Sequence, residues 1–538
     1  MAEDRGPDDQ SGSEAALKDR VQELLDAAIN PAVAGHGGYI ELIDVKDSTA
    51  YIRMMGGCQG CGAADITLKA GIERMIFEEI PEITEVLDTT DHAAGDNPYY
   101  APSKGGPATP TARRGRPVSE RRRGRAGPPR LLLLVPTTTY RTEAFVEAAT
   151  ALGVDLVIAS DRPSTFSDAY PESLLTLDFA NSGKAVEVIA DLARQRPFDA
   201  VVPVDDLTTE VGAAIAEALG LRTNAPAAIA RTRNKHRMRE ALARAGLPSP
   251  SYRLFRTDDD PETAAQSVPY PCVLKPTILS ASRGVIRADG PAAFVTAFGR
   301  VAAILRDPEV AGQPGSEEIL VEGFMAGREV ALEGLLRAGV LEVLALFDKP
   351  DPLDGPFFEE TLYVTPSRLP LEAQTAIAAA TAAAARVLDL RGGPVHAEVR
   401  VDAGGRPRLV ELAARSIGGL CSRTLRFGTG MSLEEVILRD ALDLPIATLE
   451  RERPAAGVMM LPIPRAGVLE GVEGQAEALA VPGIEAVTLT AHVGQTLVPL
   501  PEGSRYLGFV FARGDAPAGV EAALREAHRR LAFRIRPT

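Results

Sequence analysis

The chain has 538 residues, of which 45% are hydrophobic and 24% are charged, and its formal net charge is -15. A single hydrophobic core rarely serves more than about 300 residues, so this length predicts several domains. The composition is ordinary for a globular protein, and the negative charge makes the whole chain a poor nucleic-acid binder. Four cysteines argue against a disulfide-rich secreted scaffold. The acidic start MAEDRGPDDQSGSE is unlike a secretory signal and no apolar run could span a membrane, so we expect a cytoplasmic protein.

The predicted elements begin after a disordered tail, residues 1–15. Apolar residues at helical spacing predict a helix from about Leu17 to Ile29. The alternating stretches YIELIDV and TAYIRMM predict a β-hairpin after the turn HGGY. A second helix, from about Ala63 to Glu79, and a short strand in ITEVLD complete a small α+β unit, which we place at residues 16–100.

The next segment, residues 101–129, is rich in Pro, Gly and Arg without periodicity, which is typical of a linker. Its arginines could also contact RNA or an acidic partner, but charged linkers are commonly just solvated, and we expect no nucleic-acid partner. Strands then alternate with helices over residues 130–230, which predicts a Rossmann-like, mostly parallel α/β domain with ligand-facing loops at 136–139 and 205–206. A longer mixed region at 231–450 and a small β-rich domain at 451–538 follow. The expected fold class is a multidomain protein of the α/β and α+β types.

Cys58 and Cys61 form a Cys-x-x-Cys pair within GGCQGCGAADITLKAG. A closed zinc or iron–sulfur site needs four ligands, so the pair either works as a dithiol or takes its missing ligands from elsewhere. The helix that follows favours a dithiol, because a helix N-terminus lowers a thiol pKa. The flanking glycines favour a cluster shared across a two-fold axis, because they let backbone and cluster approach closely. We expect the other cysteines, Cys272 and Cys421, to be small buried residues.

Residues 17–100 resemble the NifU-like C-terminal domain, known as Nfu. The matching stretches are NPAVAGHGGYIELIDV, GGCQGCGAADITLKAGIE, IPEITEV and TDHAAGDNPYY. The resemblance implies a 4Fe-4S cluster that bridges two subunits through Cys58 and Cys61, and hence a homodimer. It also implies delivery of the cluster to apo iron–sulfur acceptor proteins, and it favours the shared cluster over the dithiol.

The stretch HAEVRVDAGGRPRLVELAAR, residues 396–415, contains two alternating strands around Gly404-Gly405. If these glycines form a two-residue turn, Glu398 lies directly opposite Glu411. Two facing carboxylates about 5 Å apart repel each other, and a divalent cation between them would reverse that penalty. The alternative is a hairpin with solvated acidic residues. Period-two spacing also places His396 on the Glu398 face and Arg415 on the Glu411 face.

Segments upstream of this hairpin carry groups that suit a nucleotide. They supply two lysines, a Ser/Arg/Gly loop and an apolar strand with acidic residues: Lys235, Lys275, Ser282, Arg283, Gly284, Glu322 and Glu329. Hydroxyl, guanidinium, ammonium and backbone N–H donors all bind phosphate. Each group alone is weak evidence for nucleotide binding, because a lysine is commonly just solvated and a Ser/Gly loop is commonly just a loop.

In their order along the chain, these segments make residues 130–538 resemble an ATP-grasp carboxylate–amine ligase. The resemblance implies that Lys235 and Lys275 contact ATP phosphates and that the 280–285 loop closes over them. It implies an adenine hinge at Glu322, Gly323, Phe324 and Met325, a ribose contact at Glu329, Mg²⁺ held by Glu398 and Glu411, and Arg415 steadying the phosphate or acyl phosphate. The usual Glu-x-Asn-x-Arg pattern has Ala413 in place of its Asn, which puts the second metal position in doubt.

The substrate groups are the least defined part of the sequence. Candidates for binding an amino or carboxyl group are Asp348, Lys349, Glu359, Glu360, Arg368, Arg423 and Arg426. Each could equally form a surface ion pair. Two functions remain: a ligase acting on a small carboxylate and an amine of the amino-acid or peptide type, or an iron–sulfur carrier whose ATP site powers or regulates cluster delivery.

Overall fold

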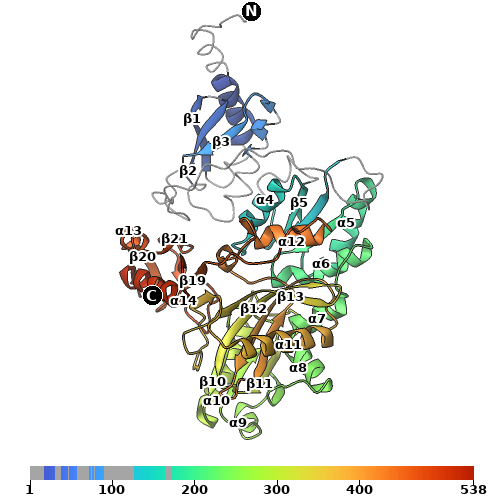
Figure 1. Cartoon of the computed structure of the whole chain (residues 1–538), viewed down its shortest axis with the longest axis vertical. Coiled ribbons are helices and arrows are strands. Elements are labelled where there is room, and N and C mark those ends of the chain that lie inside the picture. Colours follow the sequence, from blue (N-terminus) through green and yellow to red (C-terminus); the bar gives the residue numbers. More distant parts are fainter. Residues whose placement is uncertain are drawn as a thin grey trace, which may run out of the picture. The chain divides into compact units, whose positions relative to one another are not determined.

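The computed structural model describes residues 17–30, 38–46, 48–56, 72–73, 75–77, 79–89, 127–163 and 173–537. The chain divides into two compact units, each described by itself. The first comprises Met1–Pro110, Arg162–Thr176 and Thr488–Gln495, and the second Thr111–Asp161, Leu177–Val487 and Thr496–Thr538. The mixed α/β and α+β architecture expected from the sequence is confirmed (Figure 1). Among the described residues, no helix is long and apolar enough to cross a membrane.

The first unit contains a small sheet with the strand order β1-β2-β3. β1 (Gly38–Lys46) and β2 (Thr49–Gly56) form the antiparallel hairpin that the alternating sequence predicts, and β3 (Glu85–Asp88) pairs with β2 in parallel. Because alternate residues share a face, Ile40, Ile52 and Met54 are all buried in one core. A π-helical turn at Leu25–Ile29 and the short β6 (Leu174–Thr176) also belong to this unit. Cys58 and Cys61 lie outside the described residues.

The second unit begins with an α/β part in which β5 (Asp155–Ser160), β4 (Arg130–Leu134) and β7 (Ala200–Pro203) are neighbouring parallel strands. Every residue of β4 is buried, which explains the apolar run Leu131–Leu134 after its first residue, Arg130. The helices of this part are α4 (Thr142–Ala151), α5 (Ser182–Gln195), α6 (Asp206–Ala218) and α7 (Pro226–Arg233). Because β4 and β7 are parallel, the loops after them emerge at the same edge of the sheet.

A four-stranded antiparallel sheet follows, in the order β10-β9-β11-β8. Its strands are β8 (Tyr252–Arg256), β9 (Cys272–Pro276), β10 (Ile286–Ala288) and β11 (Glu318–Gly323). Its helices are α9 (Pro261–Ala265) and α10 (Pro291–Leu305), and α8 (Lys235–Arg244) precedes it. Cys272 is buried in the core between this sheet and α10, as expected.

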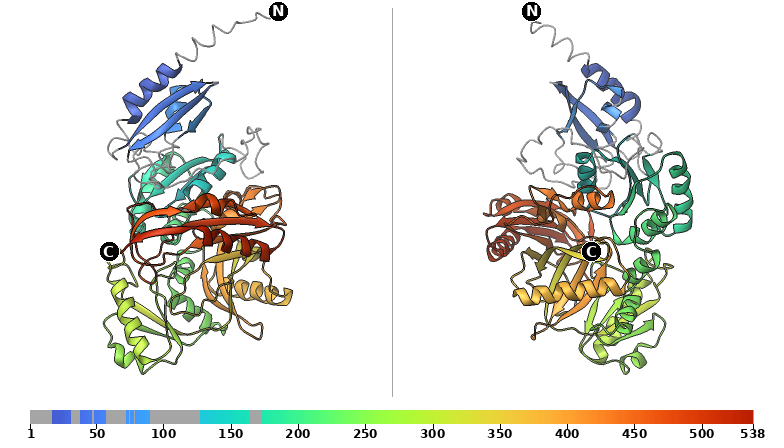
Figure 2. Two further views of the ribbon diagram at one scale, coloured as in Figure 1. Left: turned by 90° about the vertical axis from the view of Figure 1, so that its left-hand side faces the viewer. Right: turned by 45° about the vertical axis from the view of Figure 1, so that its right-hand side comes forward.

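The largest sheet has eight strands in the order β16-β15-β12-β13-β14-β19-β23-β21. They are β12 (Arg328–Arg337), β13 (Val340–Asp348), β14 (Leu362–Thr365), β15 (Gly393–Val401), β16 (Pro407–Ala413), β19 (Ala455–Leu461), β21 (Ile484–Leu489) and β23 (Gly508–Gly514). Strands from residues 451–538 thus continue the sheet that carries the carboxylate hairpin. Figure 2 shows α14 (Pro517–Arg530) against β19 and β23, where Val520 and Leu524 lie close to Gly457.

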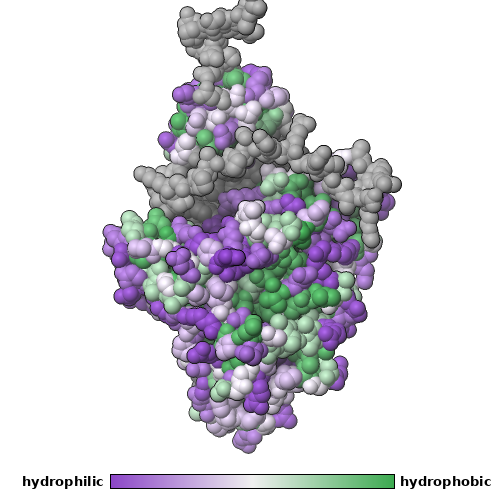
Figure 3. Space-filling view, in the orientation of Figure 1, coloured by the Kyte–Doolittle hydropathy of each residue, from purple (hydrophilic) through white to green (hydrophobic). Residues whose placement is uncertain are grey.

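The remaining elements lie around this sheet. They are α11 (Leu371–Val387), the 3-10 turn η3 (Cys421–Thr424), β17 (Arg426–Phe427), β18 (Met431–Ser432), α12 (Leu433–Ala441), β20 (Gly467–Glu473), α13 (Gln475–Leu479), β22 (Thr496–Leu497) and β24 (Ala532–Arg536). Figure 3 shows apolar surface over the middle of the molecule in this view. Val340 and Val343 of β13 and Leu371 of α11 are exposed apolar residues. Cys421 is buried, as expected.

Candidate functional site

The β15–β16 hairpin places Glu398 directly opposite Glu411, as the sequence predicts. The route to this register differs from the expected one. The turn has three residues, because the Asp402 N–H donates to Arg406 O at 3.1 Å, and an extra residue, Val410, then forms a bulge. The longer turn shifts the register by one and the bulge shifts it back, so the two carboxylates still face each other.

Each of these two carboxylates is approached by a lysine from another element. Lys235 Nζ lies 3.2 Å from Glu411 Oε1 and donates to Leu279 O at 2.7 Å. Lys349 Nζ lies 3.3 Å from Glu398 Oε1. Lys235 is the first residue of α8, whose N-terminus is capped by the Asn234 side chain. The cap fixes where the helix starts, and therefore directs Lys235 toward the hairpin.

Lys349 is surrounded by three carboxylates, Glu329, Glu360 and Glu398. Oxygens of the three residues lie within 4.8 Å of one another. Lys349 Nζ is 2.8 Å from Glu329 Oε1 and also forms an ion pair with Glu360. Burial raises the pKa of Glu360 to about 7, although Lys349 opposes this rise. Burial disfavours an ionised Glu398 as well, but Lys349 and His396 hold its pKa well below the usual range. The ammonium group is thus the internal counter-charge of the cluster.

His396 lies on the Glu398 face of β15, as period-two spacing predicts. Its Nδ1 is 3.2 Å from Glu333 Oε2 and its Nε2 is 3.9 Å from Glu398 Oε1. Burial opposes protonation of His396, but the hydrogen bonds to Glu333 and Glu398 raise its pKa overall. Glu333 Oε2 also accepts the Ile417 N–H at 3.0 Å, so this buried pair links β12, β15 and the segment after Arg415.

Lys275, on β9, shares a buried carboxylate with Arg239 of α8. Glu322 Oε2 lies 2.6 Å from Lys275 Nζ, and Glu322 Oε1 lies 2.6 Å from Arg239 Nε. Burial alone would raise the pKa of Glu322, but the two cations lower it to about 2. Burial lowers the pKa of Lys275 despite the carboxylate. The Glu322 side chain therefore positions Lys275.

The expected hinge, Glu322 to Met325, is held by backbone contacts. The Gly323 N–H donates to Ser251 O at 2.8 Å and the Phe324 N–H to Pro271 O at 3.0 Å. Met325 O accepts from Arg400 at 2.8 Å, and the Arg400 guanidinium lies 5.1 Å from the Phe324 ring centroid. Arg400 also donates to Glu329 Oε2 at 2.8 Å, which ties the hinge to the carboxylate cluster.

The loop with Ser282, Arg283 and Gly284 has a left-handed backbone. Ser282 has φ 55° and Gly284 φ 74°, and a Cβ on Gly284 would lie 2.8 Å from Pro276. Only glycine fits Gly284 without strain. Arg283 donates to Glu502 O at 2.9 Å and to Asp307 at 3.1 Å, so in this structure its guanidinium is bound to protein groups.

Arg415 is held by the α/β part of the same unit. Its guanidinium donates to Asp206 Oδ2 at 2.8 Å, and Asp206 stands at the start of α6, directly after β7. Burial opposes charge on Asp206, but Arg415 and Arg233 hold its pKa well below the usual range. The loop at 205–206, expected to face a ligand, thus contacts Arg415.

The other residues that we considered for substrate binding lie outside the cluster of Glu329, Glu360 and Glu398. Asp348 accepts from Arg368 at 2.7 Å, and Arg368 also contacts Glu521 at 2.7 Å, so these two form an ion-pair network. Burial raises the pKa of Glu359. Arg423, in η3, and Arg426, in β17, line a pocket whose lining does not include Glu398 or Glu411.

The structure adds residues that the sequence analysis did not select, namely Arg239, Arg400 and Glu333. Arg400 could have been found from the sequence, because residues 396, 398 and 400 alternate along one strand and so lie on the same face as His396 and Glu398. Arg239 lies one helical turn after Lys235, on the same helix face. Glu333 had no sequence signal, since its role depends on pairing between β12 and β15.

Four family models match the chain. They are the NifU-like domain over residues 21–87, the ATP-grasp N-terminal domain over 146–223, the ATP-grasp domain over 268–424, and the L-amino acid ligase C-terminal domain 2 over 459–536. The chain combines a NifU-like domain with ATP-grasp domains. The paired carboxylates of β15 and β16 lie inside the ATP-grasp match, and Asp206 lies inside the ATP-grasp N-terminal match.

Curated relatives match the NifU-like domain. "Fe/S biogenesis protein NfuA" from Ectopseudomonas mendocina (strain ymp) is 48% identical over 88 residues, which is 16% of this chain and 45% of that protein. The protein of the same name from Acinetobacter baumannii (strain AYE) is 44% identical over 94 residues, 16% of this chain and 44% of that protein. The chain thus spans less than half the length of these relatives.

Solved structures match the ATP-grasp domains. The L-amino acid ligase from Bacillus licheniformis has a TM-score of 0.66 and 26% identity, and the match covers 76% of this chain and 99% of that one. N5-carboxyaminoimidazole ribonucleotide synthetase from Thermotoga maritima has a TM-score of 0.55 at 16% identity, covering 76% of this chain and all of that one, at 100%. The second match supports the fold alone.

Proposed function

We propose that residues 130–538 form an ADP-forming ligase that joins a carboxylate to an amine through an acyl phosphate. The observation that carries this proposal is the facing pair Glu398 and Glu411, with a lysine ammonium 3.2 Å from Glu411. Two carboxylates and a lysine converging at one point suit a nucleoside triphosphate and its metal. The similarity to an L-amino acid ligase over most of this region supports the same reaction class.

The proposed nucleotide site is built from three groups of residues. Lys235 and Lys275 bind phosphate oxygens, helped by the loop of Ser282, Arg283 and Gly284. The adenine lies along the backbone of Glu322, Gly323, Phe324 and Met325, and Glu329 faces the ribose. The Glu322 carboxylate is engaged by Lys275 and Arg239, so its own part is to orient Lys275.

Magnesium fits the donor set of the hairpin, because Mg²⁺ prefers a carboxylate pair completed by substrate phosphates. Glu398 and Glu411 are the residues that would hold it. When bound, the ion would neutralise phosphate charge. Lys235 already approaches Glu411, and Lys349 approaches Glu398, so each carboxylate is held by a lysine. Ala413 has no amide oxygen to offer to a second metal position, and Lys349 supplies a fixed positive charge close to Glu398.

In the proposed reaction, a substrate carboxylate oxygen attacks the γ-phosphorus of ATP and ADP departs, which leaves an acyl phosphate. An amine nitrogen then attacks the acyl carbon, phosphate leaves with the bridging oxygen, and the nitrogen loses its proton. Arg415 and Lys275 are the proposed catalytic residues, since cations fixed in place stabilise the charge that moves onto the phosphate. The substrates we propose are a small carboxylate and an amine of the amino-acid or peptide type.

For the NifU-like domain we propose that Cys58 and Cys61 bind a 4Fe-4S cluster at a homodimer interface. The cluster is cargo for apo iron–sulfur proteins. The support is the 44–48% identity to proteins called Fe/S biogenesis protein NfuA, which extends over this domain only. This part also favours a second candidate function for the whole chain, an iron–sulfur carrier whose ATP site powers or regulates delivery.

The test is ADP release from ATP and Mg²⁺ with amino acids and small carboxylates, supplied singly and in pairs. ADP that appears only with a particular pair supports the ligase and identifies both substrates. Glu411→Ala separates the two functions, because loss of ADP formation with normal cluster transfer supports the ligase, whereas loss of transfer supports the carrier. Glu342→Gln, an exposed residue of β13, is the matched control and should behave as wild type.

A further inference from the structure

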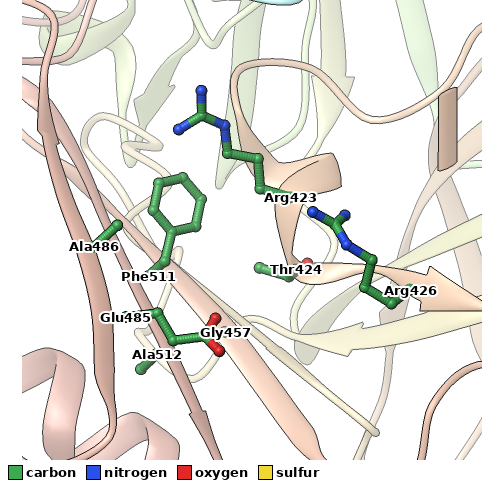
Figure 4. A pocket seen from close by; sticks show the side chains of 8 residues that line it. All are labelled: Arg423, Thr424, Arg426, Gly457, Glu485, Ala486, Phe511 and Ala512. Atoms are coloured by element: carbon green, nitrogen blue, oxygen red, sulfur yellow. The ribbon is translucent and has the colours of Figure 1, made fainter. Parts of the chain in front are cut away.

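One pocket of the second unit has neither of the paired carboxylates, Glu398 and Glu411, in its lining. It has a volume of about 160 Å³, well above the roughly 15 Å³ that one water needs. Its lining includes Arg423, Thr424, Arg426, Glu485, Ala486 and Phe511. Figure 4 shows the arginines on one side, from η3 and β17, and Phe511, Ala486 and Glu485 on the other, from β23 and β21.

The arginine side of the pocket carries two positive charges, and both act on the carboxylate of Glu147, where burial raises the pKa and Arg423 and Arg426 oppose that rise. Arg426 donates to the Leu425 carbonyl at 2.9 Å. Across the part of the chain that the structure describes, no carboxylate lies within ion-pair distance of the Arg426 guanidinium. Arg423 has only a long contact of 3.5 Å to Glu143, and about a third of its side chain is exposed, at 33%. Guanidinium groups recognise carboxylates through paired hydrogen bonds, so this side fits an incoming carboxylate.

The opposite side combines a carboxylate with apolar surface. Glu485 Oε1 accepts from Arg513 at 3.0 Å, and its carboxylate retains further acceptor capacity for an ammonium group. The Phe511 ring lies 5.7 Å below the Arg423 guanidinium and forms an apolar wall with Ala486. A ligand with a carboxylate, an ammonium group and an aliphatic part finds a matching surface for each.

The turn η3 (Cys421–Thr424) forms part of the wall of this pocket. Its first residue, Cys421, is buried, with its Sγ 3.9 Å from the sulfur of Met460. Its third residue, Arg423, and Arg426 just beyond it line the pocket. The lining residues of the pocket include none of Glu398, Glu411 and the two lysines, so the pocket offers a different set of contact groups.

We propose that this pocket is a second binding site, which takes a small amino acid in its zwitterionic form. Arg426 and Arg423 bind the carboxylate, Glu485 accepts from the ammonium group, and Phe511 contacts the aliphatic part. This assignment goes beyond the proposed ligase reaction, and it requires neither ATP nor turnover.

The experiment is saturation-transfer NMR on the full chain, without ATP, with a mixture of the twenty common amino acids as the probe. At least one should respond, and its C-terminal amide, which lacks the carboxylate charge, should not. Arg426→Gln and, separately, Arg423→Gln should each weaken binding at least about tenfold, the loss typical of a charge-assisted contact. Arg505→Gln, an exposed arginine, is the matched control and should bind like wild type.

Two further measurements make the outcome decisive. The arginine variants should have the melting temperature of wild type, which shows that they fold. Arg426→Lys keeps the positive charge and should therefore bind more tightly than Arg426→Gln. Glu411→Gln should leave the response intact. The proposal is overturned if no amino acid responds, if both arginine variants bind normally, or if the response disappears in Glu411→Gln and so belongs to the ATP-grasp centre. Binding that persists while no ADP forms with any substrate pair would reject the ligase and retain this site.

Discussion

The Asp206 carboxylate lies 2.8 Å from the guanidinium of Arg415, although 209 positions separate them in the chain. Asp206 also lies 3.6 Å from Arg233, so one carboxylate serves two guanidinium groups. Because Asp206 begins α6 and Arg415 follows β16, this contact joins the α/β part of the second unit to the carboxylate hairpin. Arg415, which we propose steadies the phosphate, is therefore held in place by Asp206 of the α/β part.

Replacing Asp206 with Asn should release Arg415 while keeping the size of the side chain. We expect a loss of about 3 kcal/mol in the free energy of unfolding, because a buried arginine loses a charged partner. The rate of ADP formation should fall at least about tenfold, since the guanidinium no longer has a fixed position. Denaturant unfolding and ADP release measure the two effects. Glu210→Gln, an exposed residue of the same helix, should change neither quantity. Unaltered ADP release in Asp206→Asn would show that Arg415 needs no positioning.

Lys349→Met should leave Glu329, Glu360 and Glu398 without their shared cation. We expect the free energy of unfolding to fall by about 3–5 kcal/mol, the usual result of breaking a buried ion pair. Adding Glu360→Gln removes one of the repelling charges, so the double variant should be more stable than Lys349→Met alone. Thermal and denaturant unfolding measure the difference. Lys184→Met, an exposed site on α5, is the control, and equal losses at both lysines would contradict the role of the cluster.

The contacts of buried Glu322 with Lys275 and Arg239 predict that the protein loses stability in acid. The pKa of Glu322 in the folded state is about 2, against an ordinary value of 4.5. These contacts therefore contribute stability that is fully present above about pH 4.5 and is lost as the pH falls toward about 2. A shift of this size corresponds to about 3 kcal/mol. Glu322→Gln cannot titrate, so its unfolding free energy should show a shallower decline below pH 4.5 than that of wild type.

Unfolding at a series of pH values tests this difference in slope. Glu342→Gln should keep the wild-type profile, because that residue is exposed on β13. Parallel curves for wild type and Glu322→Gln would contradict the assignment of this acid sensitivity to Glu322.

The cysteine pair predicts an iron content. Protein purified without oxygen should contain about two irons per chain, because one four-iron cluster would be shared by two chains. Cys58→Ala should remove this iron and its visible absorption. Cys272→Ala should retain both, since burial raises the pKa of that thiol to about 11 and keeps it from acting as a ligand. Iron that remains bound to Cys58→Ala would contradict the cluster assignment.

Several features were predictable because they depend on local periodicity. The hairpin of β1 and β2, the buried strand β4 and the parity of His396 and Glu398 all follow from period-two alternation. The facing pair Glu398 and Glu411 was predicted correctly although the turn was not. Asp402 draws the chain into a longer turn, and a bulge compensates for it.

The sequence by itself determined which residues share a strand face or a helix face, and the order in which the ATP-grasp and NifU-like motifs follow one another. Only the tertiary structure decided which groups from distant segments meet: Asp206 with Arg415, Lys349 with three carboxylates, and Glu322 with both Lys275 and Arg239. Spacing within an element is set by backbone geometry, which any short stretch displays. Ion pairs between elements depend on how whole sheets and helices pack, and burial then selects partners that can neutralise each charge.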